Sequence, residues 1–149
     1  ALTDPTVEVP HGHYADESMK ATIVPNRNAT LLMAAAGVAI SAGCTHVLTA
    51  VHAGDHPVYP DCRPEFVDAA NHAARLGTDD AVTLEAPFVD ISKTDIARRA
   101  GELGLPIKLT WSCYEGGHLH CGRCGTCVER IEALHDAGVP DPTRYRAAA

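Results

Sequence analysis

Four cysteines near the end of the chain carry its strongest chemical signal. They are Cys113, Cys121, Cys124 and Cys127, spaced as C-x7-C-x2-C-x2-C. Two overlapping C-x2-C turns share Cys124, and glycines after the first two cysteines of the run favour tight turns in which successive sulfurs point at one centre. Zinc accepts four sulfur ligands without geometric or redox demands. The pattern predicts a structural zinc site whose closed shell takes no part in catalysis.

Other uses of these cysteines are less favoured. An iron–sulfur cluster also binds four cysteines. A redox C-x2-C pair needs a thioredoxin-like βαβ context, which the neighbouring sequence does not show. The start of the chain lacks the apolar run of a secretory signal, which favours a reducing cytosol. Disulfides are rare in that compartment. His118 and His120 could replace a cysteine as ligand, but two solvent-facing loop histidines are the favoured interpretation because four cysteines already fill the shell.

The segment Val24–Asn28 precedes a buried helix and is a candidate anion site. Helix N-termini present free N–H groups and a partial positive charge. Arg27 would add a planar fork for phosphate or carboxylate. The alternative is an arginine that pairs with a nearby acid and orders the loop.

The segment Tyr59–Phe66 combines charges and prolines before another helix. Loops at the carboxyl ends of strands form the ligand crevice of α/β sheets, so Asp61 and Arg63 are candidate ligand contacts. The alternative is a local Asp–Arg ion pair with Phe66 as a hydrophobic anchor. Cys62 is a buried or bystander thiol by default.

Lys93 lies in the first turn of an expected helix, where a cation is slightly unfavourable. It is therefore a possible phosphate ligand, although a solvated lysine explains the spacing equally well. Cys44 also stands apart from the cysteine cluster and, like Cys62, is a buried or bystander thiol by default.

Helices are expected over 28–42, 65–76, 92–103 and 126–137, and strands over 45–52 and 82–85. A helical turn is expected near 16–20. Asn28, Ser92 and Thr126 are the expected caps at helix starts, and Pro64 suits a first turn. The first helix is apolar nearly all round, as in a helix covered on most sides. The second has its expected buried stripe at the positions Phe66, Ala69, Ala70 and Ala73.

Strands that alternate with helices predict an α/β fold with a parallel sheet and helices on its faces. Two strands make a poor sheet alone, so the alternation looks like part of a larger sheet. A length of 149 residues suggests one domain. No apolar stretch is long enough to span a membrane, and the net charge of −7 argues against direct nucleic-acid binding.

Seven ordered motifs together resemble the 7-cyano-7-deazaguanine synthases of queuosine biosynthesis. They are Gly12–Met19, Val24–Asn28, Tyr59–Phe66, Glu85–Phe88, Ser92–Ile96, Leu109–Gly116 and Cys121–Cys127. The likeness runs from about residue 10 to Tyr145. It implies a Rossmann-like fold of the ATP-pyrophosphatase branch, with an incomplete sheet over 1–108 and a small zinc-binding helical region over 109–149.

The resemblance also implies an activity: conversion of 7-carboxy-7-deazaguanine and ammonia to the nitrile. The acid is activated by adenylation, an amide forms, and dehydration uses further ATP. Mg²⁺ with the ATP, a zinc ion on the four cysteines, a homodimer and a cytoplasmic location are implied as well.

One departure from the family is expected to matter. The family opens with a strand and a Ser-Gly-Gly-x-Asp-Ser loop that cradles the ATP phosphates, and no such loop occurs here. The chain starts at Ala1, not methionine, and looks like the C-terminal two-thirds of the enzyme; a processed or tagged start is the alternative. Without the backbone amides of that loop, the chain alone is expected to be inactive.

Chemistry suggests roles for the site residues. A carboxylate can accept both adjacent donors of a guanine-like edge; Asp61 is the first candidate and Glu65 the weaker one. Arg63 or Arg27 would pair with the carboxylate of the substrate. Lys93 would stabilise the charge that develops on the pyrophosphate leaving group.

Two other classes of function compete with the enzyme. One is a non-catalytic zinc-binding module, a paralogue or split subunit without the nucleotide loop. The other is an ATP-pyrophosphatase of tRNA thiolation, which the segment Tyr59–Phe66 and the acidic charge disfavour.

Overall fold

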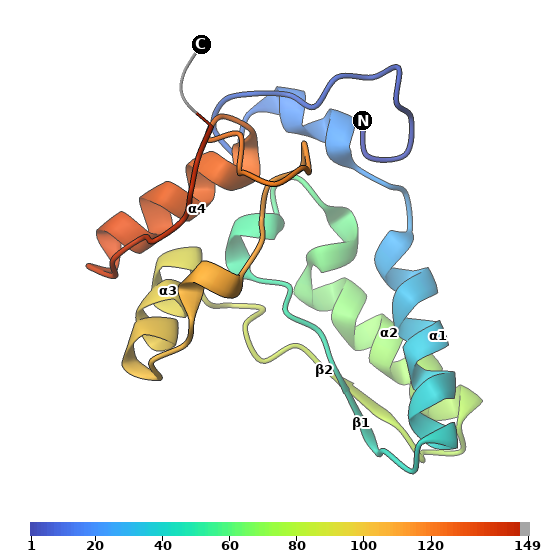
Figure 1. The fold of residues 1–149 in the computed structure, drawn as a ribbon. Helices are drawn as coiled ribbons and strands as arrows, with labels where there is room; N and C mark the ends of the chain where they lie inside the picture. The colour runs from blue at the N-terminus through green and yellow to red at the C-terminus, as the bar shows by residue number, and fades with distance from the viewer. Residues whose placement is uncertain (147–149) are drawn as a thin grey trace. The chain divides into compact units, whose positions relative to one another are not determined.

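The computed structural model describes residues 1–146, which form two compact units (Figure 1). One unit is Val24–Ile91; the other joins Ala1–Ile23 to the chain from Ser92 onward. The predicted division after residue 108 stays a prediction. Within residues 1–146, no helix combines the length and apolar character needed to cross a membrane.

The unit Val24–Ile91 contains a two-stranded parallel sheet with helices, which confirms the predicted α/β character. Its elements, in chain order, are α1 (Arg27–Ser41), β1 (His46–Leu48), the 3-10 turns η2 (Ala53–Asp55) and η3 (Pro60–Cys62), α2 (Pro64–Gly77) and β2 (Thr83–Glu85). Val47 on β1 lies opposite Leu84 on β2. The backbone N–H of Thr49 donates to the carbonyl of Glu85, which continues the pairing past β1.

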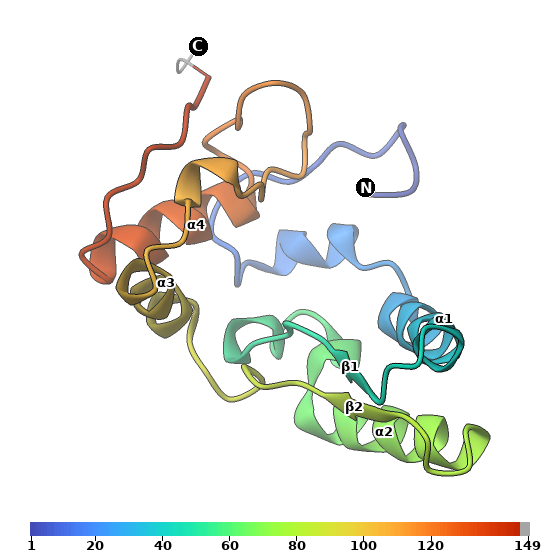
Figure 2. The same ribbon diagram turned by 60° about the horizontal axis from the view of Figure 1, so that its bottom comes forward.

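Small residues let the helices of this unit pack closely on the sheet (Figure 2). The buried cluster consists of Leu32, Ala36 and Ala39 from α1, Ala70 and Ala74 from α2, and Val82 and Leu84 at β2. The prediction that α1 is covered on most sides is wrong within the described residues, because Leu31 and Val38 are 58% and 67% exposed. The predicted stripe of α2 was also partly wrong: Ala69 and Ala73 are exposed, and Val67, Ala70 and Ala74 are buried.

The N-terminus of α1 differs from the prediction by two residues. The residue before the helix is Asn26, in the left-handed region with φ 58°, and Asn28 lies inside the first turn. Gly43 follows the helix in the left-handed region, with φ 71°. Pro64 begins α2 as predicted.

The outer edge of β2 is partly covered by a side chain of α2. The backbone N–H of Leu84 donates to Oδ1 of Asn71 (3.0 Å). This bond satisfies a donor that points away from β1, and it blocks the edge against pairing with another chain.

The second unit is mainly helical. Its elements are η1 (Glu17–Thr22), which includes the predicted turn near 16–20, α3 (Lys93–Glu102), η4 (Ile107–Leu109) and α4 (Gly125–Asp136). Helices α3 and α4 lie side by side in both views (Figures 1 and 2) and bury Ala97 against Ala133 and Leu134.

Of the two helix caps predicted for this unit, one is confirmed and one is wrong. The hydroxyl of Ser92 accepts from the backbone N–H of Asp95 (3.1 Å), which confirms the cap of α3. The cap predicted at Thr126 is wrong, because Cys124 is the N-cap residue of α4. The hydroxyl of Thr126 donates instead to the carbonyl of Ser112 (2.6 Å).

The segment before residue 23 packs on the start of α4. Met19 is fully buried, and a Cβ at Gly125 would come within 2.6 Å of its Sδ. His11 forms an isolated antiparallel bridge with Cys124. A glycine at the first residue of α4 is therefore required for this close approach.

Candidate functional site

The four cysteine sulfurs predicted as metal ligands converge on one centre. Their Sγ atoms all lie within 4.8 Å of one another, and all four side chains are buried. The Sγ atoms of Cys121 and Cys127 are 3.9 Å apart. Zinc–sulfur bonds of about 2.3 Å in a tetrahedron place sulfurs about 3.8 Å apart. The cage therefore fits one zinc ion.

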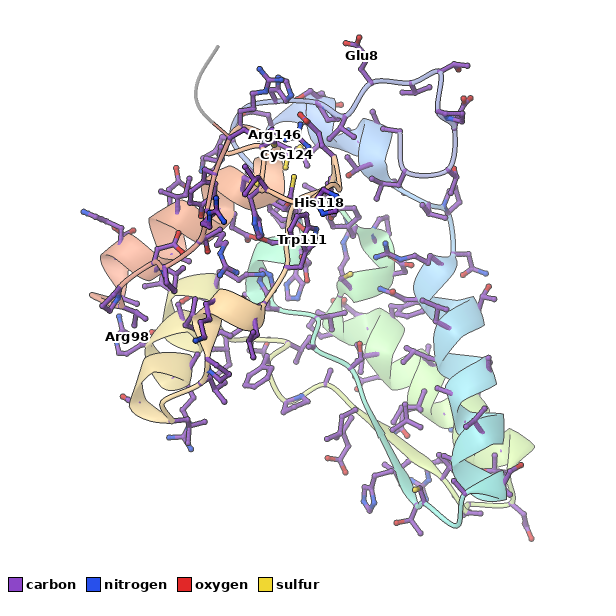
Figure 3. The ribbon with its side chains drawn as sticks, viewed as in Figure 1. Glu8, Arg98, Trp111, His118, Cys124 and Arg146 are labelled. Carbon is purple, nitrogen blue, oxygen red and sulfur yellow. The ribbon has the colours of Figure 1, made fainter. Side chains whose placement is uncertain are left out.

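Three chain segments bring these sulfurs together. Cys113 follows η4 in a segment without regular secondary structure, Cys121 and Cys124 lie in a tight turn, and Cys127 is in the first turn of α4. Gly122 within the turn has φ 77°, a conformation that favours glycine. Figure 3 shows sulfur atoms gathered around the labelled Cys124, ahead of α4.

Backbone N–H groups support negative charge on the sulfurs. The N–H groups of Cys121 and Cys124 donate to the sulfurs of Cys113 (3.3 Å) and Cys121 (3.2 Å). Burial raises the pKa values of the Cys121 and Cys127 thiols. Burial also opposes the thiolate of Cys124, but hydrogen bonds to its sulfur lower its pKa to about 7. Burial disfavours negatively charged thiolates unless a positive charge lies nearby. A bound metal cation would supply that charge.

His118 and His120 were both predicted to be solvent-facing loop histidines, and the prediction holds for only one of them. His118 is exposed, as predicted. His120 is buried, so a solvent-facing loop position is wrong for it. Its ring centroid lies 4.1 Å from that of Trp111, and its Nε2 accepts from the backbone N–H of Ser112 (3.3 Å). Burial lowers the pKa of His120, and the neutral ring braces the cysteine loop from outside the sulfur cage.

Glu115 is a residue of this site that sequence reasoning missed. Its carboxylate accepts from Nε2 of His11 and from Nη1 of Arg146, each at 2.8 Å. The bond from His11 is the main cause that lowers the pKa of Glu115. The ion pairs join three segments that are far apart in sequence, and no local pattern predicts such partners.

The substrate residues predicted in the other unit lie around the N-termini of α1 and α2. Oδ2 of Asp61 accepts from the backbone N–H of Asn28 (2.9 Å). Nε of Arg63 donates to the carbonyl of His56 (3.0 Å). Within residues 1–146 the alternative Asp61–Arg63 ion pair does not form. Arg27 and Glu65 are exposed in the first turns of α1 and α2.

Two histidines of this loop were not singled out from the sequence. His52 is buried, and its Nδ1 accepts from the backbone N–H of Gly54 (3.1 Å). Nε2 of His56 is buried and has no hydrogen-bond partner within residues 1–146. The position of both after β1 was the available signal, because ligand crevices form there.

Lys93 and the two cysteines outside the cage are the last residues that were singled out from the sequence. Nζ of Lys93 lies 3.5 Å from Oε2 of Glu129, in the unit that holds the cysteine cage. Cys62 is buried and Cys44 exposed, and neither joins the cage. Whether Lys93 acts together with Asp61 and Arg63 stays a prediction.

Comparisons with known proteins agree on one family. A family model described as "Queuosine biosynthesis protein QueC" matches residues 1–138. A 7-cyano-7-deazaguanine synthase of Porphyromonas gingivalis is 55% identical over 138 residues, which cover 93% of this chain and 63% of that protein. The synthase of Caldicellulosiruptor bescii is 55% identical over 145 residues, covering 97% and 66%.

The synthase of Rhizobium meliloti is 58% identical over 149 residues, which cover 97% of this chain and 62% of the relative. The chain therefore spans less than two thirds of the length of these curated relatives.

Proposed function

Because this chain belongs to the family of the queuosine biosynthesis protein QueC, we propose that it forms part of an ATP-dependent, nitrile-forming ligase. The proposed reaction converts 7-carboxy-7-deazaguanine and ammonia to 7-cyano-7-deazaguanine, a precursor in queuosine synthesis. The observation that carries the proposal is the match to relatives named 7-cyano-7-deazaguanine synthase along nearly the whole chain.

The proposed chemistry has two ATP-consuming stages. A carboxylate oxygen of the acid attacks the α-phosphorus of ATP, and pyrophosphate leaves with the electron pair of the broken bond. Ammonia then displaces AMP from the acyl adenylate and loses a proton, which gives the amide. A second ATP activates the amide oxygen in the same way, and loss of AMP and protons from the amide nitrogen leaves the nitrile.

The residues predicted from the sequence supply charges suited to these stages. Arg27 and Arg63 are proposed partners for anionic groups of the substrates, and Lys93 for the leaving pyrophosphate. Asp61 keeps Oδ1 available for a guanine-like edge while Oδ2 caps α1. Glu65 remains the weaker candidate for that contact.

The metal roles follow from the ligand chemistry. The cage of Cys113, Cys121, Cys124 and Cys127 would hold one zinc ion. The ion would cross-link the cysteine loop to α4, and its closed shell would leave no coordination position open for substrate. Mg²⁺ is proposed to arrive on the ATP phosphates, as a hard cation that prefers oxygen ligands.

We propose three further properties on the same family basis. The two parallel strands are few for a stable sheet, which supports their place in a larger Rossmann-like sheet. The enzyme is proposed to be a homodimer. Six free cysteines support a reducing compartment, the cytoplasm.

The 149 residues are proposed to be inactive by themselves, because they contain no Ser-Gly-Gly-x-Asp-Ser sequence to cradle the ATP phosphates. The test compares the purified chain with a fusion that adds the N-terminal third of the Rhizobium meliloti relative. Mass spectrometry measures the nitrile formed from the acid, ammonia and ATP. The fusion is expected to form the nitrile only when ATP is present, and the chain alone to form none.

Two outcomes would count against the proposal. Nitrile formation by the chain alone would contradict its inactivity. A folded, zinc-loaded fusion that forms no nitrile would favour the second candidate, a non-catalytic zinc-binding paralogue or subunit, for which the closed cysteine cage is the supporting observation.

A further inference from the structure

Two short segments cover the cysteine cage, and both belong to the unit that contains α3 and α4. They are residues 9–12 and residues 143–146. Val9 from the first segment and Tyr145 from the second pack against the four cysteines. None of these cysteines is more than 7% exposed. With both segments in place, the sulfurs and an ion between them are closed to a chelating molecule in solution.

The segment 9–12 is held on the cage by few main-chain bonds. His11 forms an isolated bridge with Cys124, outside any named strand. The backbone N–H of Gly12 donates to the carbonyl of Arg123 (3.1 Å). Pairing this short can open locally without unfolding a helix, because few hydrogen bonds and little buried surface are lost.

The segment 143–146 is held in a similar way on the opposite end of the cysteine turn. The backbone N–H of His120 donates to the carbonyl of Arg144 (3.2 Å), and the N–H of Arg146 donates to the carbonyl of His120 (2.8 Å). The ring of Tyr145 lies on Gly122, where a Cβ would come within 3.5 Å of its Cδ1. The ring therefore covers the turn that carries two of the cage sulfurs.

One carboxylate joins the two segments. Oε1 of Glu115 pairs with Nε2 of His11 (2.8 Å), and Oε2 accepts from Nη1 of Arg146 (2.8 Å). Nη2 of Arg146 also donates to the carbonyl of Gly116 (2.9 Å), and Figure 3 shows the labelled Arg146 next to Cys124. The side chains of His11 and Arg146 are 46% and 41% exposed. Ion pairs this exposed contribute little each, so the closed arrangement is one that can open.

We propose that residues 9–12 and 143–146 form a clasp over the cysteine cage, locked by Glu115, and that opening of this clasp limits the rate at which the metal ion leaves. Metal retention is then a kinetic property of two short segments, separate from the strength of the four metal–sulfur bonds. The proposal rests on the zinc ion proposed for the cage and not on the nitrile-forming reaction.

The first test uses the zinc-loaded 149-residue chain without substitutions. It is mixed with an excess of the chromogenic chelator pyridylazoresorcinol, and absorbance follows zinc release at rising chelator concentration. A clasp that must open first predicts a release rate that rises and then reaches a plateau, which is the opening rate. A rate that stays proportional to the chelator concentration over the whole range would overturn the proposal, because the chelator would then set the rate.

The second test changes the lock. Glu115→Ala removes the contacts with both segments and is expected to raise the plateau rate about tenfold. Tyr145→Ala removes the covering ring and is expected to act in the same direction. The matched control is Glu102→Ala, which removes an exposed carboxylate at the end of α3 and is expected to release zinc at the parent rate. A parent rate in both clasp variants would overturn the proposal. Circular dichroism and zinc content establish that each variant is folded and loaded before mixing.

Hydrogen exchange separates an opening clasp from a weakened cage. The backbone N–H groups of Gly12 and Arg146 are freed when the clasp opens, whereas those of Cys121 and Cys124 donate to sulfurs inside the cage. Glu115→Ala is expected to accelerate exchange at Gly12 and Arg146 by about the same factor as zinc release, and to leave the two cage amides unchanged. Faster zinc release with unchanged exchange at Gly12 and Arg146 would overturn the clasp.

The outcomes also separate the clasp from the proposed function. A parent chain that holds no zinc in metal analysis would overturn the clasp together with the zinc site. A zinc-loaded chain without a plateau would overturn the clasp alone, and nitrile formation by the fusion would be unaffected. The parent chain decides the first test by itself, so the proposal can fail even where a variant does not fold.

Discussion

Oδ2 of Asp61 accepts a hydrogen bond from the backbone N–H of Asn28 at 2.9 Å. The side chain of Asn28 in return donates to the carbonyl of Asp61 (2.9 Å) and to Sγ of Cys62 (3.2 Å). The loop after β1 is thereby tied to the first turn of α1. An anionic oxygen at the helix N-terminus is favourable, because it satisfies a free donor and complements the helix dipole.

This contact predicts a stability difference between two substitutions. Asp61→Ala removes the cap and is expected to lower the free energy of unfolding by about 1 kcal/mol. Asp61→Asn keeps an oxygen acceptor and is expected to cost much less. Urea unfolding measures both. Asp68→Ala, which removes an exposed carboxylate from α2, is the control and should change little; equal losses for all three would contradict the capping role.

The second oxygen of Asp61 leads to a prediction about binding. In the fusion that supplies the phosphate loop, Asp61→Asn is expected to weaken binding of 7-carboxy-7-deazaguanine much more than binding of ATP. The reason is that an asparagine which keeps its oxygen on the cap presents an NH2 group in place of Oδ1, and that donor cannot accept from the donors of a guanine-like edge. Equal losses for the two ligands would argue against this role.

Asn71 protects the edge of the sheet. Asn71→Leu leaves the N–H of Leu84 without its acceptor, and we expect a loss of about 1–3 kcal/mol in unfolding free energy. Asn71→Asp keeps the acceptor and serves as the control. Light scattering at rising concentration should show more self-association for Asn71→Leu, since the edge can then pair with another chain. An unchanged unfolding midpoint would show that water replaces Asn71 without cost.

The cysteines should differ sharply in reactivity. Burial is the main cause that raises the pKa of Cys62 to about 12. At pH 8 only about one molecule in 10⁴ then carries the reactive thiolate at Cys62. Cys44 is exposed, and zinc would protect the four cage cysteines. A disulfide reagent is therefore expected to modify one thiol quickly in the native protein and six after unfolding with a chelator; fast loss of two native thiols would contradict the burial of Cys62.

Metal removal tests the structural role of the cage. Cys124→Ser is expected to lower zinc content from about one per chain to near zero and to lower the melting temperature strongly, because metal-binding energy is folding energy. Cys44→Ser is the matched control and should change neither quantity. A Cys124→Ser variant that keeps both zinc and melting temperature would refute the site.

The sequence predicted features that depend on local spacing. The cysteine cage, the cap at Ser92 and the parallel βα alternation all follow from neighbouring residues, and the structure contains them. The failures depend on distant contacts. Thr126 does not cap α4 because its hydroxyl has a partner in Ser112, and His120 is buried because Trp111 and Tyr145 lie around it.

The loop that holds Asp61 illustrates the same limit. Its charges marked it as a candidate site, but the ion pair weighed as the alternative is replaced by bonds to Asn28 and His56. Sequence spacing predicts where charged groups gather. It does not predict which backbone groups engage them, because those groups come from other segments of the fold.

The central claim is that Cys113, Cys121, Cys124 and Cys127 close the shell of one zinc ion, so that the chemistry takes place elsewhere. X-ray absorption at the zinc edge tests it most directly. We predict four sulfur neighbours at about 2.3 Å and no nitrogen or oxygen neighbour. A shell with a nitrogen or a water oxygen would contradict the claim, because it would show a histidine ligand or an open position at the metal.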